Sequence, residues 1–360
     1  MWRKICRVIG FFVGCGVILA YILYASHLAQ EHRSAQCVKR VIVAMADSTE
    51  LSQFATSEQM YASLKTSGIK FDGRPIDSVD IVKMSNHIAQ NGFVRDVDVY
   101  VTYAGELYVD IKQHRPMLRL LCGGIDTYVT EDYTLFRSPK GSACYTAVIT
   151  GNYRPRFPRH YEGNFLEFSA GSIEKENDKL RDLGRAFDSL RHQHNGCKSE
   201  IAKLKKRSRK SWWESKESYK QRLIGVKVEM KSCNDRLAAL ELGRNELKKR
   251  QTLIENRKKK LQKNYDDFTN LINFVSHIKE NSFWGAEITQ FVADTTTLGE
   301  ITLRLVPRSG DFIIEFGTLA EREAKLAKLQ RFYDKGLSRI GWEHYKTIDV
   351  RYDKQVICTK

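Results

Sequence analysis

Proline is scarce in this sequence: there are six prolines among 360 residues, and none lies between Pro158 and Pro307. Within that gap the apolar residues follow a heptad pattern, which is interrupted only by the basic stretch Lys205–Ser215. Two heptad helices joined by a short loop are typical of an antiparallel coiled-coil hairpin. We place this inserted hairpin at residues 172–264.

The heptads also predict how the two helices pair. Facing core positions should have residue numbers that sum to 430, as in the pairs Leu183 with Leu247, Leu190 with Leu240, Cys197 with Cys233 and Leu204 with Val226. This register puts Cys197 and Cys233 at one level of the hairpin. They either form a disulfide or are a pair of small buried thiols, since free cysteine behaves as a small hydrophobe.

Sequence motifs of enzymes and of metal sites are missing. There is no H-E-x-x-H, G-x-S-x-G, P-loop, G-x-G-x-x-G or C-x-x-C. His192, His194 and Cys197 lie close in sequence, but residues i and i+2 do not share a face of a helix, so the histidines are poorly spaced for one ion. We therefore expect no catalytic residue, no metal, no cofactor and no small-molecule substrate.

The positive charge is confined to one segment. The net charge is +16, and residues 173–263 alone carry +14, which leaves +2 for the rest of the chain. The charged side chains of the hairpin lie mostly at exposed heptad positions, which is typical of a solvated helix face. Nucleic acid is not an expected partner.

The N-terminal residues predict a membrane anchor. Val8 to Ala25 is an 18-residue run without charge, preceded by Arg3, Lys4 and Arg7. Positive residues stay in the cytoplasm, so we expect a cytoplasmic tail at residues 1–7, a transmembrane helix at 8–25, a linker at 26–36 and the bulk of the chain outside the cytoplasm. A cleaved signal peptide is the competing interpretation.

Residues 37–113 predict a small α+β domain with the order strand, helix, helix, strand, strand. A strand is expected at Val38–Met45. The first helix should begin at a capping box formed by Thr56 and Gln59, and the second should run from an N-cap at Asp77 to Asn91. Strict alternation of apolar and polar residues on both sides of Ala104-Gly105 predicts a β-hairpin.

Residues 114–171 and 265–360 predict one β-domain, which the coiled-coil hairpin interrupts. The expected strands lie at residues 127–135, 147–150, 288–291, 300–306, 311–316, 347–352 and 355–359, and the expected helices at 265–279 and 320–337. The fold class is thus α+β, with a transmembrane helix, a βααββ domain and a β-domain that contains a long insertion.

Six motifs in this order resemble the FtsQ family of cell-division proteins, in particular its Bacteroides-type branch. They are NGFVRDVDVYVTYAGELYVDIKQHRPMLR (Asn91–Arg119), GGIDTYVTEDYTLF (Gly123–Phe136), FWGAEITQ (Phe283–Gln290), LRLVPRSGDFIIEFG (Leu303–Gly317), LQRFYDKGLSRIGWEHYKTIDVRY (Leu329–Tyr352) and the terminal KQVICTK. In this family the βααββ domain is called POTRA. The coiled-coil hairpin is a departure from the general family pattern.

The resemblance implies a non-enzymatic divisome scaffold that binds FtsL- and FtsB-like single-pass partners in the periplasm. It implies a location in the inner membrane at midcell. Family partners add a strand to the last strands of the β-domain. Residues 349–352 match the family's D-L-R-Y strand, so partner binding is expected at Arg351 and Tyr352 and, on the terminal strand, at Gln355, Val356 and Ile357.

A second class of protein fits part of the pattern. Periplasmic adaptors of export or efflux assemblies also combine an anchor, a β-domain and a coiled-coil hairpin. Such adaptors place matching half-motifs on both sides of the hairpin. Here the flanks at residues 127–153 and 288–316 do not repeat one another, which favours the division scaffold.

Overall fold

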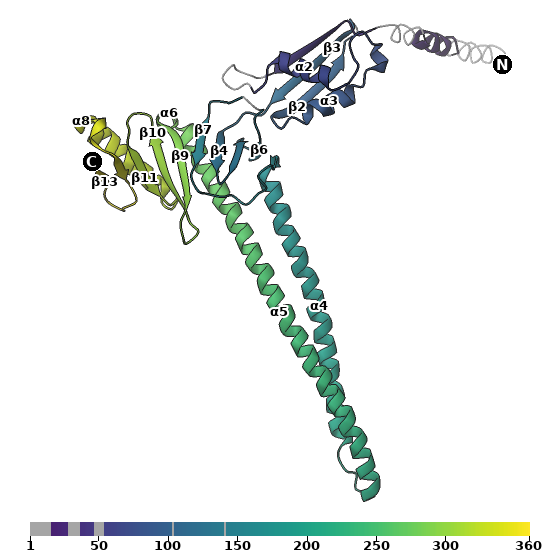
Figure 1. The fold of residues 1–360 in the computed structure, drawn as a ribbon. Helices are drawn as coiled ribbons and strands as arrows, with labels where there is room; N and C mark the ends of the chain where they lie inside the picture. Colours follow the sequence, from purple (N-terminus) through teal and green to yellow (C-terminus); the bar gives the residue numbers. More distant parts are fainter. Residues whose placement is uncertain (1–15, 28–36, 47–53, 103, 140–141) are drawn as a thin grey trace, which may run out of the picture. The chain divides into compact units, whose positions relative to one another are not determined.

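The computed structural model describes residues 16–27, 37–46, 54–102, 104–139 and 142–360 (Figure 1). Residues 16–27 form an exposed helix. The expected membrane segment, Val8 to Ala25, therefore lies only partly within the described residues. In the described ranges, no helix combines the length and the apolar character needed to cross a bilayer.

The chain divides into two compact units. One unit consists of the chain up to Tyr153, Pro158–Gly163 and Ile278–Lys360, and it holds a three-stranded sheet and most of a ten-stranded sheet. The other consists of Arg154–Phe157 and Asn164–His277, and it holds two long helices.

The three-stranded sheet and its two helices follow the predicted order. The elements are β1 (Arg40–Ala46), α2 (Ser57–Thr66), α3 (Ile81–Ala89), β2 (Val94–Val101) and β3 (Glu106–Gln113). In the sheet β3 lies in the centre, antiparallel to β2 and parallel to β1. Leu107, Val109 and Ile111 of β3 are fully buried, together with Met84 and Ile88 of α3. The apolar face of the sheet is thus covered by helices.

The two helix starts differ in how well the sequence predicted them. At Thr56 the capping box is present, with the side chains of Thr56 and Gln59 bonded to each other's backbone N–H. The second helix begins later than expected, because Asp80 and not Asp77 caps it by accepting a hydrogen bond from the N–H of Lys83 at 3.0 Å. Residues around Asp77 form the short 3-10 helix η2 (Ile76–Ser78) instead.

The ten-stranded sheet has the order β13-β12-β11-β10-β9-β7-β4-β5-β6-β8. Its strands are β4 (Leu118–Cys122), β5 (Ile125–Val129), β6 (Thr134–Phe136), β7 (Ala147–Thr150), β8 (Gly163–Asn164), β9 (Ile288–Thr295), β10 (Ile301–Pro307), β11 (Ile313–Gly317), β12 (Thr347–Asp349) and β13 (Ile357–Thr359). The parallel pair β7 and β9 joins the parts that precede and follow the long helices. The insertion therefore lies within one continuous sheet.

Several predicted strand boundaries were wrong. Strand β4 was missed, and the single strand expected at residues 127–135 is two strands, β5 and β6, that pair antiparallel across a turn at residues 130–133. The strands expected at 347–352 and 355–359 are shorter, since β12 ends at Asp349 and β13 begins at Ile357. The residues between them form a turn.

Short helices connect the later strands. They are α6 (Ser282–Glu287), α7 (Arg322–Phe332), the π-helical turn η3 (Tyr333–Leu337), α8 (Ser338–Ile340) and the 3-10 turn η4 (Trp342–His344). The helix expected at residues 320–337 is thus α7 followed by η3. Together they form the connection between the parallel strands β11 and β12, a crossover that parallel strands require.

The two long helices are α4 (Phe165–Arg207) and α5 (Lys216–Glu280), and they run antiparallel beside each other (Figure 1). Both extend beyond the predicted hairpin at residues 172–264. The separate helix expected at residues 265–279 is the last part of α5, which continues without a break. Where α4 begins, a ring cluster joins the helices: Phe165 lies 4.1 Å from Phe268 and 6.3 Å from Tyr265 between ring centroids.

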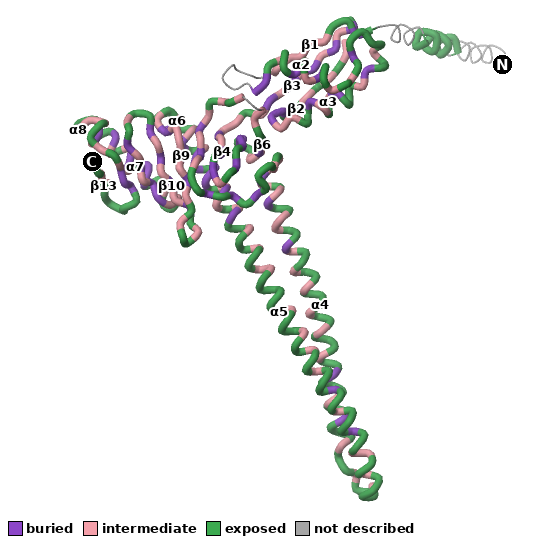
Figure 2. The backbone as a smooth tube through the Cα atoms, viewed as in Figure 1, coloured by how far each residue is buried: buried purple, intermediate pink, exposed green. Residues whose placement is uncertain are grey.

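Contacts between α4 and α5 follow the predicted register. Leu204 and Val226, whose numbers sum to 430, belong to one buried cluster with Cys233. Phe165 and Tyr265 also sum to 430, and Arg244 lies over the ring of Phe187 at 5.2 Å, one residue away from that sum. Figure 2 shows that buried positions are few and widely spaced along both helices, as a two-helix seam requires.

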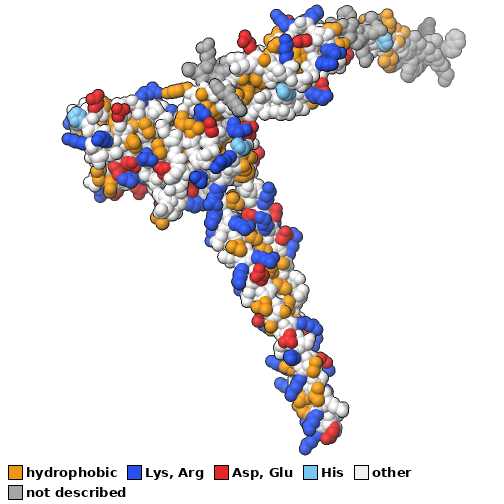
Figure 3. All heavy atoms as spheres, viewed as in Figure 1, with side chains coloured by type: hydrophobic (Ala, Val, Ile, Leu, Met, Phe, Trp, Pro, Cys, Tyr) orange, Lys and Arg blue, Asp and Glu red, His pale blue; other side chains and the backbone are white. Residues whose placement is uncertain are grey.

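Charged side chains cover the outside of the paired helices. Figure 3 shows Lys and Arg along α4 and α5, interspersed with fewer Asp and Glu. Several pairs lie within one helix, such as Arg250 with Glu246 and Lys263 with Asp267. His194 on α4 lies 3.7 Å from Glu241 on α5. The exposed pairs within one helix contribute little stability each, so the apolar seam carries most of the pairing energy.

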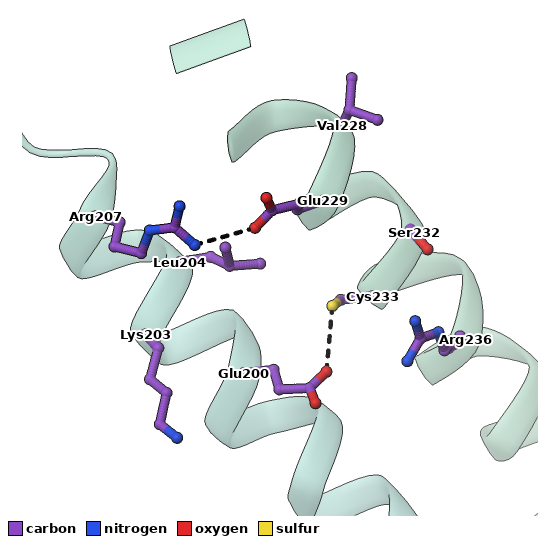
Figure 4. A pocket seen from close by; sticks show the side chains of 9 residues that line it. All are labelled: Glu200, Lys203, Leu204, Arg207, Val228, Glu229, Ser232, Cys233 and Arg236. Atoms are coloured by element: carbon purple, nitrogen blue, oxygen red, sulfur yellow. Dashed lines mark hydrogen bonds and ion pairs between the residues drawn. The ribbon is translucent and has the colours of Figure 1, made fainter. Parts of the chain in front are cut away.

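Cys197 and Cys233 are both buried, and both are free thiols. The Cys233 thiol donates a hydrogen bond to Glu200 at 3.5 Å, next to an ion pair of 3.2 Å between Arg207 and Glu229 (Figure 4). Burial and this hydrogen bond raise the pKa of the Cys233 thiol. In the structure, Cys197 and Cys233 are therefore two buried thiols. A disulfide between them stays a prediction.

Candidate partner-binding edge

One edge of the ten-stranded sheet is formed by β13. This strand pairs antiparallel with β12, with Ile348 opposite Cys358 and Asp349 opposite Ile357. The described sheet has no strand on the other side of β13. An edge strand of this kind presents unpaired backbone groups that can accept a further strand.

Strand β12 is held firmly against the rest of the sheet. It pairs parallel with β11, and Ile348 and Val350 are fully buried. Arg351 follows the end of β12 by two residues, and its side chain lies beside the carboxylate of Asp349.

Asp349 and Arg351 form a two-point ion pair. The Arg351 side chain donates from Nε to both carboxylate oxygens of Asp349, at 2.9 and 3.0 Å, and its backbone N–H donates to Asp349 Oδ1 at 2.9 Å. Burial alone would raise the pKa of the Asp349 carboxyl, but the hydrogen bonds from Arg351 outweigh it and the pKa lies below its usual range. The same bonds raise the pKa of the Arg351 guanidinium.

Gly317 at the end of β11 makes room for this arginine. Its φ is +73°, and a Cβ placed there would lie 2.7 Å from Cγ of Arg351. A side chain at this position would therefore collide with Arg351 and would also adopt an unfavourable backbone conformation. The glycine fixes how closely Arg351 can lie against the sheet.

A lysine of α7 holds the turn between β12 and β13. Lys328 Nζ donates to the carbonyl oxygen of Tyr352 and, at 3.4 Å, to that of Asp353. The turn is thus fixed by contacts of its backbone and leaves the Tyr352 side chain outward, with 47% of its surface exposed. This geometry presents an aromatic ring beside the edge strand.

The five predicted contact residues lie together at this end of the sheet, but only one of them is in a strand. Ile357 begins β13 and is 38% exposed. Arg351, Tyr352, Gln355 and Val356 belong to the turn, which corrects the prediction that they lie in strands. Three of these four are exposed and Val356 is half-buried.

Sequence reasoning missed three residues that shape this edge: Asp349 as the partner of Arg351, Lys328 and Gly317. The spacing of Asp349 and Arg351 at i and i+2 in the strand predicted at residues 347–352 was a signal for their pairing. Lys328 and Gly317 are distant from the turn in sequence, and their contacts depend on the crossover through α7.

Metal-binding geometry is missing from the described part of the chain. No group of three His, Cys, Asp or Glu side chains lies there in a position to hold an ion. Burial raises the pKa of the Cys122 thiol to about 11, and burial with a hydrogen bond to Glu200 raises that of Cys233. Thiols of this kind stay protonated near neutral pH and are poor nucleophiles.

Two family models match the chain. Residues 242–359 match the model described as "FtsQ/DivIB, C-terminal related", and residues 35–112 match the model described as "POTRA-like domain". The chain is an FtsQ-family protein. A search of curated proteins finds no match.

The two matches fall on the structural features of this FtsQ-family protein. The POTRA-like match covers the three-stranded sheet and its helices and ends in β3. The C-terminal match begins inside α5, includes β9 to β13, and ends at the last residue of β13. The candidate edge therefore lies entirely within the family-related part of the chain, and α4 lies outside both matches.

Proposed function

We propose that this FtsQ-family protein binds FtsB- and FtsL-like single-pass proteins in the periplasm and thereby recruits and regulates the septal wall-synthesis proteins. FtsQ and POTRA families are non-enzymatic division proteins, and the two family matches suggest a cell-division scaffold. We further propose that the segment Val8–Ala25 anchors the chain in the inner membrane, with the N-terminus in the cytoplasm.

Strand addition at β13 is the proposed mode of binding. The observation that carries it is the edge itself: β13 ends the sheet order, and Tyr352 and Ile357 lie exposed beside it. In strand addition the backbone hydrogen bonds provide affinity and the neighbouring side chains provide specificity. An exposed tyrosine and isoleucine supply an apolar contact for a partner strand.

The test is co-purification of the FtsB-like partner with two variants of the full chain. Tyr352→Ala removes the exposed ring, and a central aromatic contact contributes about 2 kcal/mol or more, so the dissociation constant should rise by a factor of about 30. Ile357→Lys places a charge on the edge, a device by which natural edge strands avoid pairing. We expect both variants to lose the partner.

A matched control is Tyr100→Ala. Tyr100 lies on β2 of the three-stranded sheet and is 45% exposed, close to the value of Tyr352. This variant should bind normally and should still gather in a midcell band. Normal binding by both Tyr352→Ala and Ile357→Lys would show that the partner uses another surface, and an even distribution in the envelope would contradict the division function itself.

A further inference from the structure

The turn between α4 and α5 exposes two tryptophans. Trp212 is 90% exposed, the largest value for a large apolar side chain among the described residues, and Trp213 is 75% exposed. Their rings meet edge to face with centroids 5.5 Å apart. Because an indole in water is costly, two adjacent exposed indoles at the end of a long hairpin indicate a surface that becomes covered.

Basic side chains surround these tryptophans. Those exposed between the end of α4 and the first turns of α5 are Lys205, Lys206, Arg207, Arg209, Lys210, Lys216 and Lys220. The same stretch contains only two acids, Glu214 and Glu217. We call the exposed surface of residues 205–220 the hairpin tip. Its charge favours an anionic partner.

Arg222 fixes the conformation of the hairpin tip. Its guanidinium donates to both carboxylate oxygens of Glu214, at 2.8 and 2.6 Å, and to the carbonyl oxygens of Arg207 and, at 3.2 Å, Arg209. The hydroxyl of Tyr219 donates to the carbonyl of Ser208 at 3.3 Å. The bonds from Arg222 lower the pKa of Glu214, so this acid stays ionised and its charge is matched internally.

A hollow lies beside Trp213. It has a volume of about 630 Å³, and its lining includes Lys206, Arg207, Arg209 and several serine hydroxyls. Guanidinium and ammonium groups beside hydroxyls are the donors that recognise phosphate. The hairpin tip thus combines indoles with a place for a phosphate group.

We propose that the hairpin tip binds the interface of a bilayer that contains anionic phospholipids. Tryptophan is the residue type that settles at the membrane–water interface, and each Lys or Arg near an anionic surface adds about fivefold to the affinity. A protein groove would cover an apolar stripe along a helix, whereas here two exposed indoles lie in the turn at the end of the hairpin, in a stretch rich in exposed cations. That arrangement suits a flat, negatively charged surface.

The test uses the full chain reconstituted into phosphatidylglycerol vesicles whose acyl chains carry bromine, which quenches the fluorescence of nearby indoles. The signal of interest is the decrease in fluorescence caused by bromine that is seen with the unchanged chain and is lost in the variant Trp212→Phe/Trp213→Phe. It should be present with phosphatidylglycerol, absent with phosphatidylcholine, and weakened by 0.5 M salt through screening. The N-terminal segment is the same in every sample.

Two variants that remove the same number of charges separate the effect of charges at the hairpin tip from that of the overall charge of the chain. Lys205→Gln/Lys206→Gln/Lys210→Gln removes three charges at the hairpin tip and should weaken the interaction on the order of 100-fold. Lys248→Gln/Lys249→Gln/Lys260→Gln removes three exposed charges far from the tip in sequence and should leave the quenching unchanged.

Three results would overturn the proposal. Equal quenching in phosphatidylcholine would show that the charges play no part. Loss of the signal with inorganic phosphate at matched ionic strength would indicate a site for a free anion. If bromine does not quench the two tryptophans, and a purified protein or wall glycan shields them from solvent instead, the hairpin tip binds that class of partner.

Discussion

Leu204→Ala should increase the population of hairpins in which the paired helices are open next to Cys233. This opening can be measured through the reactivity of Cys233. Leu204 is 6% exposed and lies in one cluster with Val226 and Cys233, which are 1% and 7% exposed. Truncating a buried leucine to alanine costs about 2–5 kcal/mol, and the lower end applies here because a two-helix seam is close to solvent. The population of the open hairpin should therefore rise by a factor of about 30.

The assay is the rate at which a small alkylating reagent modifies Cys233 at constant pH, followed by mass spectrometry of the peptide that contains it. When opening and closing are fast, this rate follows the population of the open state. Leu242→Ala is the control, since Leu242 lies on α5 and is 72% exposed. If Leu204→Ala does not speed labelling, or if Leu242→Ala speeds it equally, the helices do not pair in the register described above.

Two further predictions concern the edge of the large sheet. The pKa of Asp349 is lower in the folded protein than in the unfolded chain, so its pair with Arg351 should contribute about 2 kcal/mol near neutral pH, and this contribution should disappear as pH falls through the folded pKa. Asp349→Asn should then lower the unfolding temperature more at pH 7 than at pH 3, and an equal effect at both would refute the pair. Gly317→Ala should lower the free energy of unfolding in urea by about 1–2 kcal/mol because of its positive φ, and by more because of the contact with Arg351. Gly299→Ala, with φ +78° and nothing within 4 Å, should show the backbone cost alone. Equal losses in the two glycine variants would mean that Arg351 does not lie over Gly317.

Periodic segments were predicted well because burial leaves a direct trace in the sequence. The strands around Ala104-Gly105 pair as expected, with Val97 opposite Ile111 and Val99 opposite Val109. The heptads likewise gave the correct partner for Leu204, which lies in one cluster with Val226, since one face of each helix must be apolar.

Boundaries were predicted less well because they depend on contacts between distant residues. The alternation in residues 347–352 continues past Asp349, but Arg351 folds back onto that carboxylate over Gly317, and the strand ends there. Similarly, both Asp77 and Asp80 are suitable N-cap residues, and in the structure Asp80 caps the helix that buries Met84 and Ile88. Local propensity cannot distinguish such alternatives.

The candidate edge was predicted as a location but not in its details. The family resemblance pointed to Arg351, Tyr352 and the terminal strand, and the structure has these residues together at the end of the sheet. The support from Lys328 could not be foreseen, since α7 precedes the turn by some twenty residues and only the crossover brings its lysine to the carbonyl of Tyr352.

The stacking of Phe165 on Tyr265 has a consequence for the order of folding. Strands β7 and β9 must find each other across 142 residues, as between Val148 and Gln290. Once α4 and α5 have paired, the rings of Phe165 and Tyr265 lie 6.3 Å apart. The hundred residues between these rings then no longer add to the length of the loop that connects β7 with β9. The saving in closure entropy is about 1 kcal/mol. The hairpin can thus act as a folding clamp, which forms from local contacts and brings the two halves of the sheet within reach of one another.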